Sequence, residues 1–174
     1  MSTALISIIC EDRPGLIAGV TGLLFDLGIN LADTTFAVLG GGAEFTLVAK
    51  LPDRVSLKEL ESELGALPEL KDAELTVTPF SYRESHGESA RITHRIEITG
   101  DDSPGLIARL SEAFGAFGAN IVRLNSESVP GASGARFLLR MAIWVPQDKA
   151  DACLATVANT AGQMNLKCQW QQVG

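Results

Sequence analysis

Cysteines and long apolar runs are scarce in this sequence of 174 residues, and each shortage excludes a class of protein. The three cysteines, Cys10, Cys153 and Cys168, are far apart and form no Cys-x-x-Cys pair. Neither a disulfide framework nor a metal-binding cluster is therefore predicted, and a reducing compartment fits best. No apolar run approaches membrane-spanning length, and no basic region precedes the first apolar segment. We therefore expect a cytoplasmic protein with no membrane segment.

Histidine is also rare. The two histidines, His86 and His94, stand far in sequence from any cysteine and belong to no metal-ligand or nucleophile motif. Residues of this kind are more often surface or structural than catalytic. We therefore expect no metal, no cofactor and no enzyme activity.

Basic residues are outnumbered, with 14 Lys and Arg against 21 Asp and Glu and a net charge of −7. Residues 1–90 carry 6 basic and 14 acidic side chains, a net −8, whereas residues 91–174 carry 8 and 7, a net +1. This balance argues against direct nucleic-acid binding, because phosphate neutralisation needs clustered cations. The asymmetry indicates that the two halves present different surfaces and meet different partners.

A repeat organises what the sequence does contain. The stretch Glu-Asp-Arg-Pro-Gly-Leu-Ile-Ala at residues 11–18 returns ninety positions later as Asp-Asp-Ser-Pro-Gly-Leu-Ile-Ala at residues 101–108. Gly28-Ile29-Asn30 and Gly118-Ala119-Asn120 match at the same offset, which widens to 92 at Phe45 and Phe137. Two units of roughly 80 to 90 residues are therefore predicted, with the two extra residues placed in a hairpin loop of the second unit.

Apolar periodicity gives both units the same order of elements. In the first, we predict strands at residues 4–10, 29–39, 44–51 and 74–80 and helices at residues 16–27 and 57–67. In the second, strands are predicted at residues 91–99, 120–129, 136–145 and 166–173 and helices at residues 106–117 and 149–161. The order βαββαβ predicts an α+β, ferredoxin-like fold with two helices on one face of a four-stranded antiparallel sheet. The domains predicted are residues 1–80 and 91–174, joined by a polar linker at residues 81–90.

The same strand order occurs in RNA-recognition modules and in acylphosphatase, and neither fits. The third strands, residues 44–51 and 136–145, lack the glycine and aromatic signature of RNA-recognition modules. The first loop lacks the arginine-bearing pattern of acylphosphatase. Fold alone would not establish either function.

The repeated turn is the candidate binding site. Pro14 and Pro104 suit the first helical position, Ser103 suits the N-cap before it, and each following glycine then lies unusually inside a first turn. Unpaired N–H groups at such a helix start accept a carboxylate, and a nearby Asp or Asn can meet an ammonium group. A free amino acid is therefore the predicted ligand. The residues expected to bind it are Asp12, Gly15, Leu16, Ile17 and Asn30, and Asp102, Gly105, Leu106, Ile107 and Asn120 in the second copy.

A structural interpretation competes with this one. An Asp before a Pro-Gly helix start can simply favour the helix dipole, and the two glycines can permit close helix-to-sheet packing. Spacing alone leaves both interpretations open.

Asp-Arg-Pro-Gly-Leu-Ile, followed by an amphipathic helix and Gly-Ile-Asn, resembles the ACT domain, a regulatory module that commonly binds amino acids. The second copy resembles it as well. With Phe36-Ala37-Val38-Leu39 and Glu44-Phe45-Thr46, the pair of units resembles the glycine cleavage system transcriptional repressor family. The resemblance implies sheets joined side by side through edge strands at residues 33–37 and 123–127, and a ligand held between the turn of one unit and the second strand of another. Serine-binding ACT units have His where this chain has Cys10 and Gly100, so serine is not favoured.

Two hypotheses follow. The first is a regulator that binds an amino acid and changes its contact with a protein partner, either a transcription factor or a metabolic enzyme. Its control of transcription, including that of glycine metabolism, would be indirect, and we expect a homo-oligomer. The alternatives are a ligand-free structural interaction module and a stand-alone regulatory subunit of a metabolic enzyme.

Overall fold

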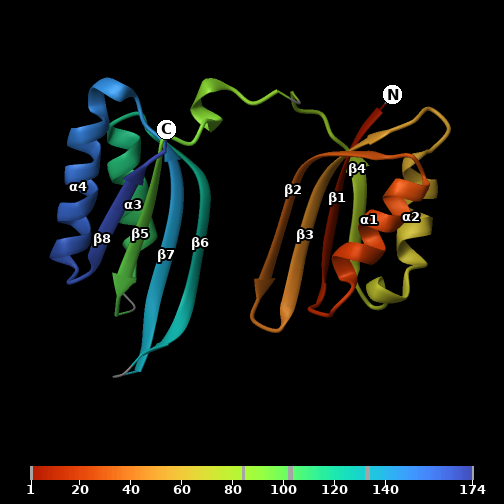
Figure 1. Cartoon of the computed structure of the whole chain (residues 1–174), viewed down its shortest axis with the longest axis horizontal. Coiled ribbons are helices and arrows are strands. Elements are labelled where there is room, and N and C mark those ends of the chain that lie inside the picture. The colour runs from red at the N-terminus through yellow and green to blue at the C-terminus, as the bar shows by residue number, and fades with distance from the viewer. Residues whose placement is uncertain (1, 84, 102–103, 132–133, 174) are drawn as a thin grey trace. The chain divides into compact units, whose positions relative to one another are not determined.

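The chain divides into two compact units, residues 1–82 and residues 83–174. The computed structural model describes residues 2–83, 85–101, 104–131 and 134–173, without the side chains of residues 131, 134 and 135. Each unit has its own sheet, helices and core, shown in red to yellow-green and in green to blue in Figure 1. We describe each unit by itself.

The first unit is a four-stranded antiparallel sheet with two helices on one face (Figure 1). Its strands pair in the order β2-β3-β1-β4, so β2 and β4 are the edge strands. The elements are β1 (Ser2–Glu11), α1 (Leu16–Asp26), β2 (Asn30–Leu39), β3 (Gly42–Leu51), α2 (Leu57–Gly65) and β4 (Glu74–Pro79), with a 3₁₀ turn η1 at Pro68–Leu70.

The second unit repeats this architecture with the strand order β6-β7-β5-β8. Its elements are β5 (His94–Gly100), α3 (Leu106–Ala116), β6 (Asn120–Gly131), β7 (Gly134–Trp144), α4 (Ala150–Gln163) and β8 (Lys167–Gln172), with 3₁₀ turns η2 at Glu88–Ala90 and η3 at Gln147–Lys149. The predicted α+β class and the βαββαβ order of both units are confirmed.

Each core lies between the helices and one face of the sheet. Alternate residues of β1 are buried, among them Ile6 and Ile8, because successive side chains of a strand point to opposite faces. In the first core these side chains meet helix residues such as Leu24 and Leu60. Ile98 and Phe114 belong to the corresponding core of the second unit. The opposite face of each sheet carries no helix of its own unit (Figure 1).

A glycine follows the end of α1 and of α3, and a capping box starts α2, as the sequence predicts. Gly28 and Gly118 have φ values of +70° and +68° directly after α1 and α3, the left-handed conformation of a helix C-terminal cap. At the start of α2, the Glu59 N–H donates to Ser56 Oγ at 3.2 Å and the Ser56 N–H donates to Glu59 Oε2 at 3.4 Å. No helix among the described residues has the length and apolar character needed to cross a membrane.

The predicted hairpin-loop insertion is wrong. Leu39 pairs with Gly42 at the tip of the first hairpin, and Gly131 pairs with Gly134 at the tip of the second, so both close over two residues. The extra length is in the paired strands instead. In the first unit the last residue of β1, Glu11, pairs with Gly42 at the start of β3, whereas Gly100 of β5 pairs with Phe137, further along β7. An added ladder pair satisfies its own backbone groups, so a hairpin can grow without a longer loop.

His94 is a buried polar residue of the second core, 8% exposed. Its Nδ1 lies 3.0 Å from Thr93 Oγ1, and its backbone pairs with Ile143 on one side and Gln172 on the other. Burial lowers the pKa of His94 below its ordinary value, and the nearby Asp151 carboxylate opposes this only in part. The structural role expected for this histidine fits its position.

We predict that His94 makes the second unit sensitive to acid. A histidine whose folded pKa is depressed stabilises the fold above its unfolded pKa of 6.5, and this stability is lost as the pH falls below that value. Urea unfolding followed by tryptophan fluorescence reports this unit, because Trp144 and Trp170 both lie in it. His94→Gln should flatten the pH dependence between pH about 7.5 and about 5.5, and the exposed control His86→Gln should not. Parallel pH profiles for wild type and His94→Gln would contradict the prediction.

Candidate functional site

The repeated turn joins the first strand of each unit to its first helix through a left-handed glycine. Gly15 has φ +93° and ψ −15° and is the N-cap of α1, which begins at Leu16. Gly105 has φ +82° and ψ +1° and caps α3 in the same way. The expectation that Pro14 and Pro104 take the first helical position is therefore wrong. The glycines are required by backbone conformation, since L-residues with a Cβ disfavour this region.

Close packing does not explain these glycines. Apart from its two chain neighbours, no atom of the described residues lies within 4 Å of a Cβ built on Gly15 or on Gly105. The competing interpretation, that they let a helix approach a sheet, is therefore not supported at either position.

The turn leaves backbone donors available at the start of α1. The Leu16 N–H donates to the Arg13 carbonyl at a long 3.4 Å, and the first regular helical bond runs from the Gly19 N–H to the Gly15 carbonyl at 2.8 Å. The N–H groups of Gly15 and Ile17 have no acceptor within the part of the chain that the structure describes. These donors carry the partial positive charge of a helix N-terminus.

A depression of about 540 Å³ lies over these donors and is lined by residues 12–18 and Phe36; we call it the turn hollow. Asp12 is exposed there, and its N–H donates to the Gly41 carbonyl at 3.1 Å, which fixes the backbone before the turn. Ile17 is 45% exposed. The Phe36 ring packs edge-on against the Phe45 ring, with 5.6 Å between the ring centroids. The hollow thus combines a carboxylate, free N–H donors and an apolar wall.

Leu16 belongs to the site only through its backbone, because its side chain is 1% exposed and lies in the core. In the second unit Leu106 is buried and Ile107 is 38% exposed, so the two turns place these side chains alike. Asp102 and Ser103 lie outside the described residues.

Asn30 and Asp12, which are both expected to bind the ligand, lie at opposite ends of the sheet within one unit. Asn30 pairs with Lys50, and Lys50 pairs with Thr3 on β1. Thr3 precedes Asp12 by nine residues of extended chain, a separation of about 30 Å. The sequence argument failed here because β2 begins at the end of the sheet opposite the turn.

Asn120 has a structural contact of its own. Its Nδ2 donates to the Ser89 carbonyl at 2.8 Å and so attaches η2 to the beginning of β6. This bond crosses part of the segment that the sequence assigns to a linker, residues 81–90. In the second copy, therefore, the Asn after the helix already has a partner.

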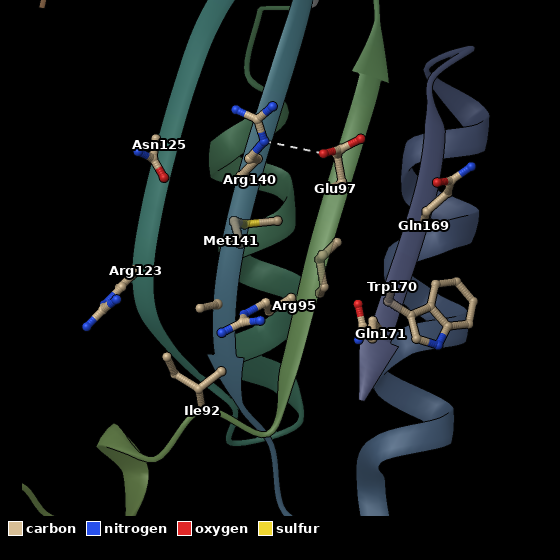
Figure 2. Close-up of a pocket in the computed structure, with 12 residues that line it drawn as sticks. Ile92, Arg95, Glu97, Arg123, Asn125, Arg140, Met141, Gln169, Trp170 and Gln171 are labelled. Carbon is tan, nitrogen blue, oxygen red and sulfur yellow. Dashed lines mark hydrogen bonds and ion pairs between the residues drawn. The ribbon is translucent and has the colours of Figure 1, made fainter. Parts of the chain in front are cut away.

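Sequence reasoning missed a second hollow, on the face of the β5–β8 sheet opposite α3 and α4. This arginine hollow has a volume of about 510 Å³, and Figure 2 shows its polar side chains along four neighbouring strands. They are Arg95, Glu97, Arg123, Asn125, Arg140, Gln169 and Gln171. The sequence does show charged residues alternating along β5, but only the strand register brings arginines from three strands together.

The comparisons with known proteins find one family model, and two relatives that match over most of the chain. Residues 4–69 match the family model of the ACT domain. The glycine cleavage system transcriptional repressor of Escherichia coli (strain K12) is 27% identical over 175 aligned positions, which cover 92% of this chain and 88% of that protein. The same identity and coverage hold for the repressor of the same name from Shigella flexneri.

Two solved structures have the same fold over nearly the full length. An unknown protein from Galdieria sulphuraria superposes with a TM-score of 0.76 at 19% identity, over 99% of both chains. A candidate glycine cleavage system transcriptional repressor superposes with a TM-score of 0.68 at 16% identity, over 99% of this chain and 97% of the other.

We predict that the left-handed turn makes Gly15 and Gly22 respond oppositely to the same substitution. Gly15→Ala should destabilise the first unit by about 1 kcal/mol, because alanine disfavours positive φ. Gly22 lies within α1 with open space around its Cβ position, so Gly22→Ala should stabilise the unit by about 0.5–1 kcal/mol. Urea unfolding followed by far-UV circular dichroism measures both changes. Tryptophan fluorescence should be unaffected, and equal effects of the two variants would contradict the assignment.

Proposed function

We propose that this chain, whose first unit is an ACT domain and whose second unit repeats its fold, is a regulatory protein that binds a free amino acid. Two relatives are named as transcriptional repressors, which supports a regulatory role over a catalytic one. The binding event would change contact with a protein partner, a transcription factor or a metabolic enzyme. The name shared by its relatives favours an accessory transcriptional regulator of amino-acid metabolism, with glycine metabolism as the first candidate.

The turn hollow carries this proposal, because it offers complementary groups to both poles of a zwitterion. The ligand carboxylate would accept hydrogen bonds from the N–H groups of Gly15 and Ile17, which have no other acceptor among the described residues. The ligand ammonium would face the exposed Asp12 carboxylate. Phe36 and the exposed part of Ile17 would limit the size of the ligand side chain.

The second turn would bind through the N–H groups of Gly105, Leu106 and Ile107, with Asp102 as the matching carboxylate. Because the Asn120 amide already holds Ser89, it would have to exchange that partner in order to reach a ligand. The two sites would therefore differ in affinity.

An acidic first half supports indirect control of transcription. Residues 1–90 carry a net −8, and a negative surface repels nucleic-acid phosphates. The chain would therefore reach DNA only through its protein partner.

We expect at least one common amino acid at millimolar concentration to raise the thermal midpoint of the first unit. A ligand at 100 times its dissociation constant adds about 2.7 kcal/mol to folded-state stability. Glycine is tested first, and circular dichroism gives the midpoint. Asp12→Asn, which replaces a carboxylate with an amide, should abolish the shift. Glu61→Gln makes the equivalent replacement at an exposed position of α2 and should keep the shift. No shift with any amino acid would leave the ligand-free interaction module as the better hypothesis.

Asn30 can join the turn hollow only from another copy of the chain, because the turn of its own unit lies at the far end of the sheet. If a second copy supplies it, Asn30→Ala and Asp12→Asn should each lose the ligand shift alone. A mixture of the two variants should regain part of it, because some mixed pairs contain one intact site. Ligand response retained in Asn30→Ala would exclude this residue from the site.

A further inference from the structure

The arginine hollow lies on the outer face of the second sheet, where no helix of that unit covers it. Arg95, Ala142 and Arg123 stand side by side on β5, β7 and β6, since Ala142 pairs with both arginines. The small Ala142 side chain, 8% exposed, forms the floor between two long ones. Neighbouring strands are about 4.8 Å apart, so the two arginine Cα atoms are separated by about 10 Å. Both guanidinium groups can therefore reach one small molecule seated over Ala142.

Arg140 precedes Ala142 by two residues on β7, so both lie on the same face of the sheet. It forms ion pairs with two carboxylates. Its Nε donates to Glu97 Oε2 at 3.3 Å and its Nη1 donates to Glu127 Oε1 at 2.6 Å, and the Glu97 bond is visible in Figure 2. These bonds, the one to Glu127 first, raise the pKa of Arg140 above its ordinary value. Arg140 is thus ion-paired on both sides, and the two carboxylates more than balance its charge.

Arg95 and Arg123 differ from Arg140 in having no carboxylate partner among the described residues. Three side-chain amides, Asn125, Gln169 and Gln171, line the hollow beside them. Guanidinium groups present planar pairs of donors that match carboxylate and phosphate oxygens, and amides can donate to the same oxygens. The hollow is therefore suited to an anion.

The first unit shows that the fold does not require these arginines. Leu5, ninety residues before Arg95, pairs with Val48 and Thr78 just as Arg95 pairs with Ala142 and Gln171. At these three positions the first unit has Leu5, Val48 and Thr78, whereas the second has Arg95, Ala142 and Gln171. A feature that one repeat has and the other lacks points to a function of the second unit alone.

We propose that the arginine hollow binds a small dianion that presents two carboxylate groups or a phosphate group. Its volume is that of a small-molecule site. Its lining mixes apolar side chains such as Trp170 with charged and amide groups, and the two arginines without a carboxylate partner among the described residues distinguish it from the charge-depleted centre of a protein interface. The site is separate from the turn hollow and does not depend on amino-acid binding there.

Titration calorimetry of the full chain at low ionic strength tests the proposal, with succinate and inorganic phosphate as probes and acetate as the monovalent control. Succinate or phosphate should bind, whichever is tighter identifying the anionic group, and acetate should bind at least about tenfold more weakly, because it engages one arginine fork instead of two. Arg95→Gln and Arg123→Gln should each weaken binding by at least about tenfold.

The control variants separate this site from general charge effects and from the turn hollow. Arg109→Gln removes one exposed arginine from α3 and should leave the affinity unchanged. Asp12→Asn should also leave it unchanged, so failure of the amino-acid proposal does not affect this test. Equal loss of affinity in Arg109→Gln would overturn the proposal, and so would affinities for succinate and for phosphate that both fail to exceed the affinity for acetate.

Discussion

Each sheet of this chain buries only one face, and the rest of the structure depends on that constraint. Ile6 of β1 and Leu47 of β3 point into the first core beneath α1 and α2. A register slip of one residue would turn these side chains to the outer face, so apolar burial fixes the pairing of all four strands. The inner face is consequently constrained to apolar residues, while the outer face can carry other chemistry.

The same constraint produces the backbone donors of the turn hollow. Because α1 must run back over the inner face, the chain reverses between Glu11 and Leu16, and it does so through Gly15 at positive φ. A helix that begins so abruptly leaves its first N–H groups without intrahelical partners. The donors are therefore a consequence of the fold, whereas Asp12, the carboxylate of the proposed site, is exposed and not needed by the core.

Local patterns were sufficient to predict the elements, and they failed where distance along the sheet mattered. Strand alternation and the Ser56 capping box are local signals, and both were confirmed. The position of Gly15 outside the helix could not be distinguished from a first-turn position by composition, because the distinction is a dihedral angle. Asn30 was placed beside Asp12 because both match a known motif, yet parallel β1 and β2 put the two at opposite ends of the sheet.

The arginine hollow was beyond prediction for a related reason. Arg95, Arg123 and Arg140 are scattered in sequence, and only the pairings of Ala142 and Arg140 with their neighbours bring them to one surface. The net charges of residues 1–90 and 91–174 did indicate different surfaces for the two units, but they could not say which face of the sheet differs.

Duplication explains how that difference could arise without loss of the fold. In both units the inner face is held to the same apolar pattern, and Ile6 and Ile96, ninety residues apart, are both buried. The outer positions Leu5 and Arg95 make equivalent backbone pairs, so exchanging one side chain for the other leaves the ladder unchanged. Substitutions therefore cost the least folding stability on the outer face of the sheet, where they disturb neither the core nor the turn. A tandem of two such units can keep one ligand chemistry at its turns and acquire another on a single sheet.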